Sequence, residues 1–505
     1  MSLGLVEILV IALAAVLFAA LIPPRWRGWA ILLGSVIGIY WLQPPLAPRW
    51  ADFLLPSATI ALGVAGWWLS RQHQQAFLSP VHDDDDHPGG RDPHIYVQDD
   101  WLTLLVVMTV ILALSLFRYA PAELRLTASR PPTPLFVAVT ALEVGLLFLA
   151  LAIILRRVGH WVALNGGIAA ILFLFVLVKW SPATTVVAGW WRSLTEQDVS
   201  LAAPSDLVWL GFAYVVVRII HTIRDRRMNV MPDMPLSAYL SYILFIPAFV
   251  AGPIDRIQRF SGDYHALGSL RGFDPVRWGS GLWRVGEGLF KKFVVADLLA
   301  QGMSLTPALA EQTESAAAMW LLLFGYGLRI YFDFSGYTDI AIGLGMLFGF
   351  RLPENFNRPY TRSNITTFWQ SWHMSLSEWV RFYIFTPLSR ALLRRRSKAA
   401  GLLTPTTIVL SAHLATMIAI GLWHSISWNF FIWGLWHGVG LFIHKQWSDR
   451  TRKWYRGLQG RPWPRRAWAV AGWGMTVLFV MLGWVWFLLP TPQMALDTFA
   501  KLFSF

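Results

Sequence analysis

Two histidines, His373 and His424, stand in tryptophan-rich apolar sequence, where ionisable side chains are costly. Neutral imidazole can take a proton from a hydroxyl group as that group attacks a carbonyl carbon, because its ordinary pKa lies near neutral pH. Apolar surroundings disfavour imidazolium and keep such a base unprotonated. The alternative is a purely structural role, in which either ring only serves as the partner in a buried hydrogen bond. We therefore treat both histidines as candidate catalytic residues and ask which elements position them.

The residues around His373 predict one continuous helix. Apolar residues recur at steps of three and four, at Ile365, Trp369, Trp372, Leu376, Trp379 and Tyr383. A neighbouring stripe with the same spacing carries only polar side chains: Thr366, Gln370, His373, Ser377 and Arg381. A helix with aromatic residues on one side and a polar ridge beside them suits the wall of a wet cavity inside a membrane protein.

The residues around His424 predict a turn between two membrane-embedded helices. Residues 404–423 are apolar and long enough to cross most of a bilayer, and residues 429–445 return. His437 falls inside the return. Basic residues precede the first helix and follow the second, which places both flanks on the cytoplasmic side by the positive-inside rule.

The composition is that of a polytopic membrane protein. Of 505 residues, 55% are hydrophobic, only 14% are charged and 29 are tryptophan. The absence of cysteine excludes disulfides, thiolate nucleophiles and cysteine-ligated metals. The net charge of +13 is explained by cytoplasmic loops, so we expect no nucleic acid partner.

Apolar segments along the chain predict an all-α membrane protein with about eleven to thirteen membrane segments, some of them re-entrant or broken. The first, 1–22, has no basic leader region and is interpreted as a transmembrane helix rather than a cleavable signal. The others are 29–43, 52–69, 101–117, 134–155, 162–178, 204–222, 236–252, 315–332, 335–350, 404–423, 429–445 and 467–489. Residues 274–303 are amphipathic and predict a helix lying at the membrane interface, either as a headgroup anchor or beside a phosphate-bearing donor.

Two polar features need a separate interpretation. The loop from Val81 to Asp100 holds three histidines and seven aspartates, but their spacing matches no metal site, so we interpret it as a solvated linker and predict no metal. Asp333 and Asp339 lie in apolar sequence, where they either pair with a cation such as Arg329 or orient a catalytic histidine. The pairing is the simpler expectation.

A series of motifs in the second half resembles the membrane-bound O-acyltransferase family. The motifs are AGPIDR (251–256), GLFKKFVVAD (288–297), YFDFSGYTDIAIGLGMLFGF (331–350), ENFNRPY (354–360), FWQSWHMSLSEWVRFYIFTPL (368–388) and GLWHSISWNFFIWGLWHG (421–438). The bacterial branch with the alginate O-acetylation and teichoic-acid D-alanylation membrane proteins is the most similar. His424 matches the invariant histidine of the family, and His373 matches its second histidine. Ser425 stands where the family usually has glycine, and Phe382 where it usually has aspartate.

The resemblance implies a bundle around a central tunnel open to both sides of the membrane. A cytoplasmic acyl thioester, on coenzyme A or a carrier protein, would meet a hydroxyl of an extracytoplasmic polysaccharide, cell-wall polymer or relay protein. His424 would then be the general base, while His373 would polarise the thioester carbonyl or hold the donor. The expected substrate-binding residues are Trp369, Gln370, Trp372, Ser377, Arg381, Ser425 and Trp428. No cofactor beyond the donor is expected.

The same reading gives the expected organisation and location of the chain. We expect N-terminal transmembrane helices in 1–235 with a polar loop at 71–100, a catalytic core in 236–445, and a basic loop, last transmembrane helix and tail in 446–505. The expected location is the bacterial inner membrane, with lipid and an acyl-relay or polysaccharide-modifying protein as partners. Two other functions remain open: a histidine-lined transporter or channel, and a non-catalytic membrane subunit of a polysaccharide export complex.

Overall fold

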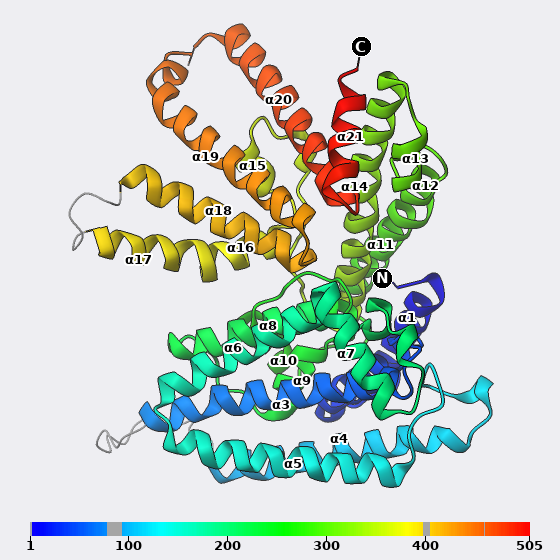
Figure 1. The fold of residues 1–505 in the computed structure, drawn as a ribbon. Helices are drawn as coiled ribbons and strands as arrows, with labels where there is room; N and C mark the ends of the chain where they lie inside the picture. Colours follow the sequence, from blue (N-terminus) through cyan, green and yellow to red (C-terminus); the bar gives the residue numbers. More distant parts are fainter. Residues whose placement is uncertain (1–2, 78–92, 397–403, 459, 505) are drawn as a thin grey trace. The chain divides into compact units, whose positions relative to one another are not determined.

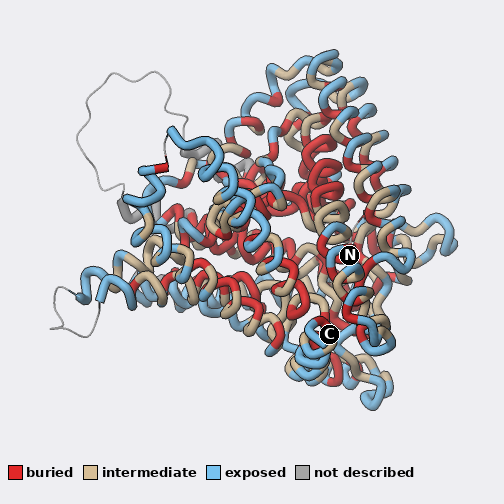
Figure 2. Tube along the Cα trace, turned by 90° about the horizontal axis from the view of Figure 1, so that it is seen from above, coloured by how far each residue is buried: buried red, intermediate tan, exposed pale blue. Residues whose placement is uncertain are grey.

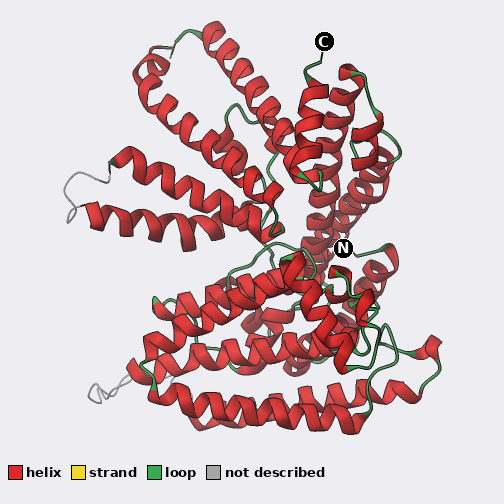
Figure 3. Ribbon diagram, viewed as in Figure 1, coloured by secondary structure: helices red, strands yellow, loops and turns green. Residues whose placement is uncertain are grey.

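The computed structural model describes residues 3–77, 93–396, 404–458 and 460–504, and regular structure in these ranges is entirely helical (Figure 3). Six helices are long and apolar enough to cross a membrane: Ala51–Ser70, Asp100–Tyr119, Pro134–Leu155, Trp161–Lys179, Pro405–His424 and Pro462–Leu488. The shorter segments Leu5–Leu21 and Leu236–Ala248 are also apolar. The all-α, multi-pass prediction is confirmed, whereas the predicted number of membrane segments stays a prediction.

The chain divides into two compact units. The first holds residues 1–282 and 343–352, and the second holds residues 283–342 and 353–505. The first unit contains α1 (Leu5–Leu21), α2 (Arg27–Leu42), α3 (Ala51–Phe77), α4 (Pro93–Ser115), α5 (Pro134–Arg157), α6 (His160–Lys179), α7 (Ser181–Leu194), α8 (Phe212–Arg227), α9 (Leu236–Leu244), α10 (Ile257–Ala266) and most of α11 (Pro275–Leu289) (Figure 1). Short 3₁₀ turns connect several of these helices.

The core of the first unit is built on α8 and α9, which are buried along most of their length. Figure 2 shows how the buried and exposed stretches alternate along the trace. The guanidinium of Arg218 on α8 is 1% exposed and donates to the backbone oxygens of Ile243 at 2.8 Å and Ala248 at 2.9 Å. These carbonyls lie where α9 ends and a 3₁₀ turn, Ile246–Ala248, begins, so they have no partner within a regular helix. Arg218 therefore secures the irregular end of an apolar segment.

The second unit contains the end of α11, a π-helix at Phe290–Ala296, α12 (Asp297–Ala300), α13 (Pro307–Gln312), most of α14 (Ala316–Leu347), α15 (Ile365–Trp369), α16 (Met374–Val380), a second π-helix at Arg381–Phe385, α17 (Thr386–Arg396), α18 (Pro405–His424), α19 (Trp428–Gly457), α20 (Pro462–Leu488) and α21 (Pro492–Leu502). Helices α18 and α19 form an extensively packed pair, and α20 packs against α19 (Figure 1). This arrangement places His424 between α18 and its return.

Two predicted spans, 315–332 and 335–350, are in fact one helix, α14. The helix is not interrupted between residues 332 and 335, and Gly336 lies where α14 crosses α11. A Cβ atom at Gly336 would lie 2.8 Å from the backbone oxygen of Gly288, and one at Gly288 would lie 2.5 Å from that of Gly336. Only two glycines allow the backbones to approach this closely.

The aspartates of α14 are paired, as expected, but with other partners than Arg329. Asp339 accepts from Arg284 Nε and Lys291 Nζ, each at 2.7 Å, and Asp333 accepts from Lys292. Arg329 instead donates to Ser304 Oγ at 3.3 Å. The amphipathic segment 274–303 is helical from Pro275 to Ala300. Arg284, Lys291 and Lys292 pair with aspartates of α14, whereas Arg277 donates to the backbone oxygens of Arg271 and Gly272. The predicted position of this segment at the membrane interface stays a prediction.

Other boundaries also differ from the sequence reading. The basic segment after residue 445 continues α19 to Gly457 instead of forming a loop, and the C-terminal tail contains α21. Most of the predicted acidic linker, residues 81–92, lies outside the described residues, and α4 already begins at Pro93. Charged residues at a helix end do not by themselves stop a helix, which explains the longer α19.

Candidate active site

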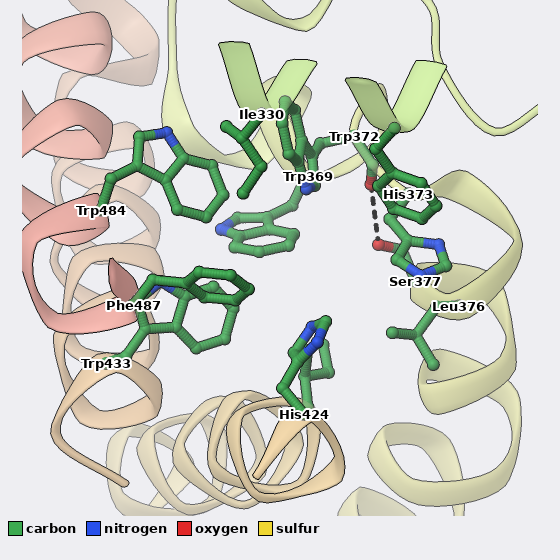
Figure 4. Close-up of a pocket in the computed structure, with 12 residues that line it drawn as sticks. Ile330, Trp369, Trp372, His373, Leu376, Ser377, His424, Trp433, Trp484 and Phe487 are labelled. Atoms are coloured by element: carbon green, nitrogen blue, oxygen red, sulfur yellow. Dashed lines mark hydrogen bonds between the residues drawn. The ribbon is translucent and has the colours of Figure 1, made fainter. Parts of the chain in front are cut away.

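A cavity of about 30 Å³ lies in the second unit and is lined by both candidate histidines (Figure 4). Its walls come from α14, the α15 to α16 segment, α18, α19 and α20. The twelve lining residues are Ile330, Phe334, Trp369, Trp372, His373, Leu376, Ser377, Ile420, His424, Trp433, Trp484 and Phe487. The sequence separation of these elements means that tertiary packing, rather than any one motif, forms the site.

The prediction of one continuous helix through His373 is wrong, because the helix is interrupted between Trp369 and Met374. Helix α15 ends at Trp369, and His373 adopts left-handed backbone angles, φ 44° and ψ 53°, before α16 begins. Such angles cost a non-glycine residue about 1–3 kcal/mol and persist only where surrounding contacts impose them. The polar residues from Thr366 to Arg381 therefore do not form one ridge.

Asn355 supplies the contacts that hold this turn. Its backbone oxygen accepts from Met374 N at 2.9 Å. Its side-chain Oδ1 accepts from Ser375 N at 3.1 Å and from Ser375 Oγ at 2.7 Å, and lies 3.2 Å from His373 Nδ1. Asn355 is fully buried, and His373 is 3% exposed. One asparagine from the ENFNRPY motif thus touches three consecutive residues of the turn.

His424 is the last residue of α18, and aromatic rings surround it. Its ring lies 5.0 Å from Phe487, 5.9 Å from Phe430 and 6.1 Å from Trp433, measured between centroids. The side chain is half-buried, in contrast to His373. Figure 4 shows the two histidines on different walls of the same cavity, with Trp484 and Phe487 closing the side opposite His373. The arrangement places two imidazoles in a small, mostly apolar space.

His437, the third histidine of this region, lies behind the cavity wall. It is fully buried, and its ring contacts those of Trp369 at 5.1 Å and Trp433 at 4.8 Å. It is not among the lining residues. His437 therefore packs the wall, and nothing in its position gives it access to a substrate.

The structure brings together only some of the predicted substrate-binding residues. Trp369, Trp372 and Ser377 line the cavity beside the two histidines. Four others do not line it: Gln370 and Arg381 are exposed, Ser425 is half-buried at the end of α18, and Trp428 is 72% exposed. The break before α16 separates Gln370 from Ser377. Arg381 lies after the break, where α16 passes into the π-helix Arg381–Phe385.

The sequence reading missed the contributions of α14 and α20. Ile330 and Phe334 lie one turn apart on α14, and Trp484 and Phe487 lie one turn apart on α20. A signal for α20 exists in the aromatic run GWVWF at 483–487, which resembles the tryptophan-rich sequence near both histidines. Nothing comparable distinguishes Ile330.

One partly exposed ion pair lies at the end of α11. Glu287 at the end of α11 accepts from Lys291, and this hydrogen bond lowers the pKa of the Glu287 carboxyl. Within the described parts of the chain, no three histidine or acidic side chains cluster in a way that could hold a metal ion.

Comparison with known proteins identifies the family. The model of the MBOAT, or membrane-bound O-acyltransferase, family matches residues 171–489, which include every residue that lines the cavity. The chain belongs to the membrane-bound O-acyltransferase family. The matched range includes His373 and His424, the two histidines that lie in the family-like sequence motifs.

Several family members are similar in sequence. A probable alginate O-acetylase AlgI of Azotobacter vinelandii is 33% identical over 305 residues, which cover 59% of this chain and 54% of that protein. A teichoic acid D-alanyltransferase of Streptococcus thermophilus is 32% identical over 297 residues, covering 56% and 69%. A peptidoglycan O-acetyltransferase of Helicobacter pylori is 33% identical over 259 residues, covering 50% and 44%. The chain thus spans about half the length of most of these relatives.

Proposed function

We propose that this membrane-bound O-acyltransferase family member transfers a short acyl group from a thioester to a hydroxyl of a polysaccharide or cell-wall polymer. The observation that carries the proposal is the convergence of His373 and His424 on one cavity. The family match and the names of the relatives, which act on alginate, teichoic acid and peptidoglycan, support the reaction class and the kind of acceptor.

The proposed step needs one base and one leaving group. His424 takes the proton from the acceptor hydroxyl while the oxygen attacks the thioester carbonyl carbon. The new carbon to oxygen bond forms, the carbon to sulfur bond breaks, and the protonated His424 gives its proton to the departing sulfur, which leaves as the thiol. The aromatic walls from Trp369, Trp433 and Phe487 exclude water, which favours transfer over hydrolysis of the thioester.

The size of the cavity supports a short acyl group. About 30 Å³ is space for one or two water-sized groups, and bulky rings such as Trp372 and Trp484 close it. An acetyl group is of this order, whereas a fatty acyl chain would need a long apolar channel. Small acyl groups are also those named for the similar proteins.

We propose that the donor reaches the cavity from the cytoplasm and the acceptor from the opposite side. Support comes from the positive-inside rule, which places the basic ends of α17 and α19, including Arg394, Arg395 and Arg396, on the cytoplasmic side. In bacteria this topology corresponds to the inner membrane. The same topology would let an extracytoplasmic relay or polysaccharide-modifying protein receive the acyl group.

The proposal is tested with membranes that contain the full chain and its polymer acceptor, supplied with radiolabelled acetyl-coenzyme A. We expect His424→Ala to lower polymer-bound label by about 10²-fold or more, the usual contribution of a general base. The matched control is His413→Ala: His413 lies on the same helix, bonds to the backbone oxygen of Val409 at 2.9 Å and does not line the cavity. Transfer that survives His424→Ala at normal protein levels would refute the assignment.

A further inference from the structure

The hydrogen bonds around Asn355 determine which nitrogen of His373 carries a proton. The backbone N–H of Ser375 can only donate, and it lies 3.1 Å from one end of the Asn355 amide. That end must therefore be the oxygen, because the opposite orientation would bring two N–H groups together. The orientation of the Asn355 amide is thus set by the backbone N–H of Ser375, which can only donate a hydrogen bond.

The same oxygen faces His373 Nδ1 at 3.2 Å. An amide oxygen only accepts hydrogen bonds, so a hydrogen bond at this position requires a proton on Nδ1. In neutral imidazole the second nitrogen then carries a lone pair and no proton. His373 Nε2 is buried and has no hydrogen-bond partner among the residues that the structure describes.

Ring packing keeps His373 from escaping this arrangement. The imidazole lies edge-on to Phe334 at 4.8 Å and to Trp423 at 6.1 Å. The left-handed backbone at His373 is held at the same time by Met374 N, which donates to the Asn355 backbone oxygen. A rotated ring would give up the Asn355 contact.

We infer that Asn355 is a positioning residue that holds neutral His373 in its Nδ1–H tautomer, so that Nε2 accepts a hydrogen bond from an O–H group in the cavity. When substrate binds, the matching group is a hydroxyl of the acceptor other than the one that His424 deprotonates, a step that rests on the proposed function. A thioester carbonyl cannot fill this role, because it too only accepts. This differs from the expectation that neutral His373 polarises the carbonyl.

The test reads the tautomer directly by nitrogen NMR of the full chain in lipid nanodiscs, with ¹⁵N-labelled histidine. Nitrogen shifts distinguish protonated from bare ring nitrogens, and His373→Gln identifies the signals of His373. For the wild type, near neutral pH, we expect a protonated Nδ1 and a bare Nε2. A wild-type spectrum with the proton on Nε2 would overturn the inference, whatever the variants do.

Variants of Asn355 and Ser375 separate a specific effect on the His373 tautomer from a general destabilisation of the turn. Asn355→Asp keeps an acceptor and should keep the Nδ1–H tautomer, whereas Asn355→Ala should move the proton to Nε2 in part or wholly. Ser375→Ala is the control, because it removes another contact to the same oxygen and should leave the tautomer unchanged. An unchanged tautomer in folded Asn355→Ala would also contradict the inference.

An activity measurement then connects the tautomer to the proposed reaction. Asn355→Ala should lower kcat for label transfer by tenfold or more, with Asn355→Asp retaining more activity, since losing the partner that fixes a catalytic histidine can cost up to about 10⁴-fold. Ser375→Ala should stay near the wild type. If the wild type shows the expected tautomer but transfers no acyl group, the proposed function fails and the assignment of the tautomer stands.

Discussion

At the scale of single residues, the buried carboxylate of Asp339 in the second unit is neutralised by cations that contact it directly. Asp339 is 4% exposed, and its two oxygens each accept from a different cation, Arg284 and Lys291. These cations come from the amphipathic segment, so the network joins α11 and the first π-helix to α14. The cost of burying one carboxylate is offset by two charge-assisted hydrogen bonds.

Removing the Asp339 charge should therefore destabilise the fold more than removing an exposed one. We expect Asp339→Asn to lower stability by about 1–3 kcal/mol, since two partly buried cations lose their shared partner. Thermal unfolding of purified protein, followed by tryptophan fluorescence, measures the change. The control is Asp449→Asn in the exposed Lys445 pair, where about 0–0.5 kcal/mol is expected. Equal shifts for both variants would contradict a structural role for Asp339.

At the scale of elements, the crossing of α11 and α14 shows that two glycines only two residues apart in one helix can differ in their importance for stability. Gly288 meets the backbone of Gly336, whereas a Cβ atom at Gly286 would find open space within 4 Å. Both glycines lie in the same helix, so intrinsic helix propensity acts equally on them. Only the tertiary contact separates the two positions.

The pair gives a matched prediction. Gly288→Ala should destabilise the protein by about 1–3 kcal/mol, because its Cβ would overlap backbone atoms that cannot move aside. Gly286→Ala should be neutral or stabilise by about 0.5–1 kcal/mol through helix propensity. The unfolding midpoints of the two variants check this directly. A stable Gly288→Ala protein would mean that the helices cross less closely than described.

The break before α16 shows where sequence reasoning reaches its limit. Residues 365–383 contain no proline or glycine, and their periodicity fits a helix, so local rules predict an unbroken one. The turn at His373 is imposed by Asn355, which lies 18 residues earlier in the chain. A tertiary contact of this kind overrides propensity and leaves no local signal.

At the scale of the whole molecule, composition and apolar runs were enough to predict an all-α membrane protein, and motif order was enough to predict the family. Both histidines and three further lining residues, Trp369, Trp372 and Ser377, were also found from sequence. Gln370 and Arg381 do not line the cavity, and their role in substrate binding stays a prediction. The α14 wall left no signal in the sequence, because helix packing rather than spacing brings Phe334 to the cavity, and the aromatic run at 483–487 that marks α20 did not enter the prediction of the site.

The absence of cysteine makes the central claim measurable, because a single introduced cysteine reports on one position alone. Ser377→Cys would place a thiol on the cavity wall, and Thr338→Cys, at a position 1% exposed and outside the lining, serves as the buried control. We predict that a small methanethiosulfonate reagent modifies Ser377→Cys but not Thr338→Cys, and that saturating acetyl-coenzyme A slows the modification severalfold. A Ser377→Cys protein that resists the reagent, or whose modification acetyl-coenzyme A leaves unchanged while acyl transfer persists, would contradict the claim that this cavity is where donor and acceptor meet.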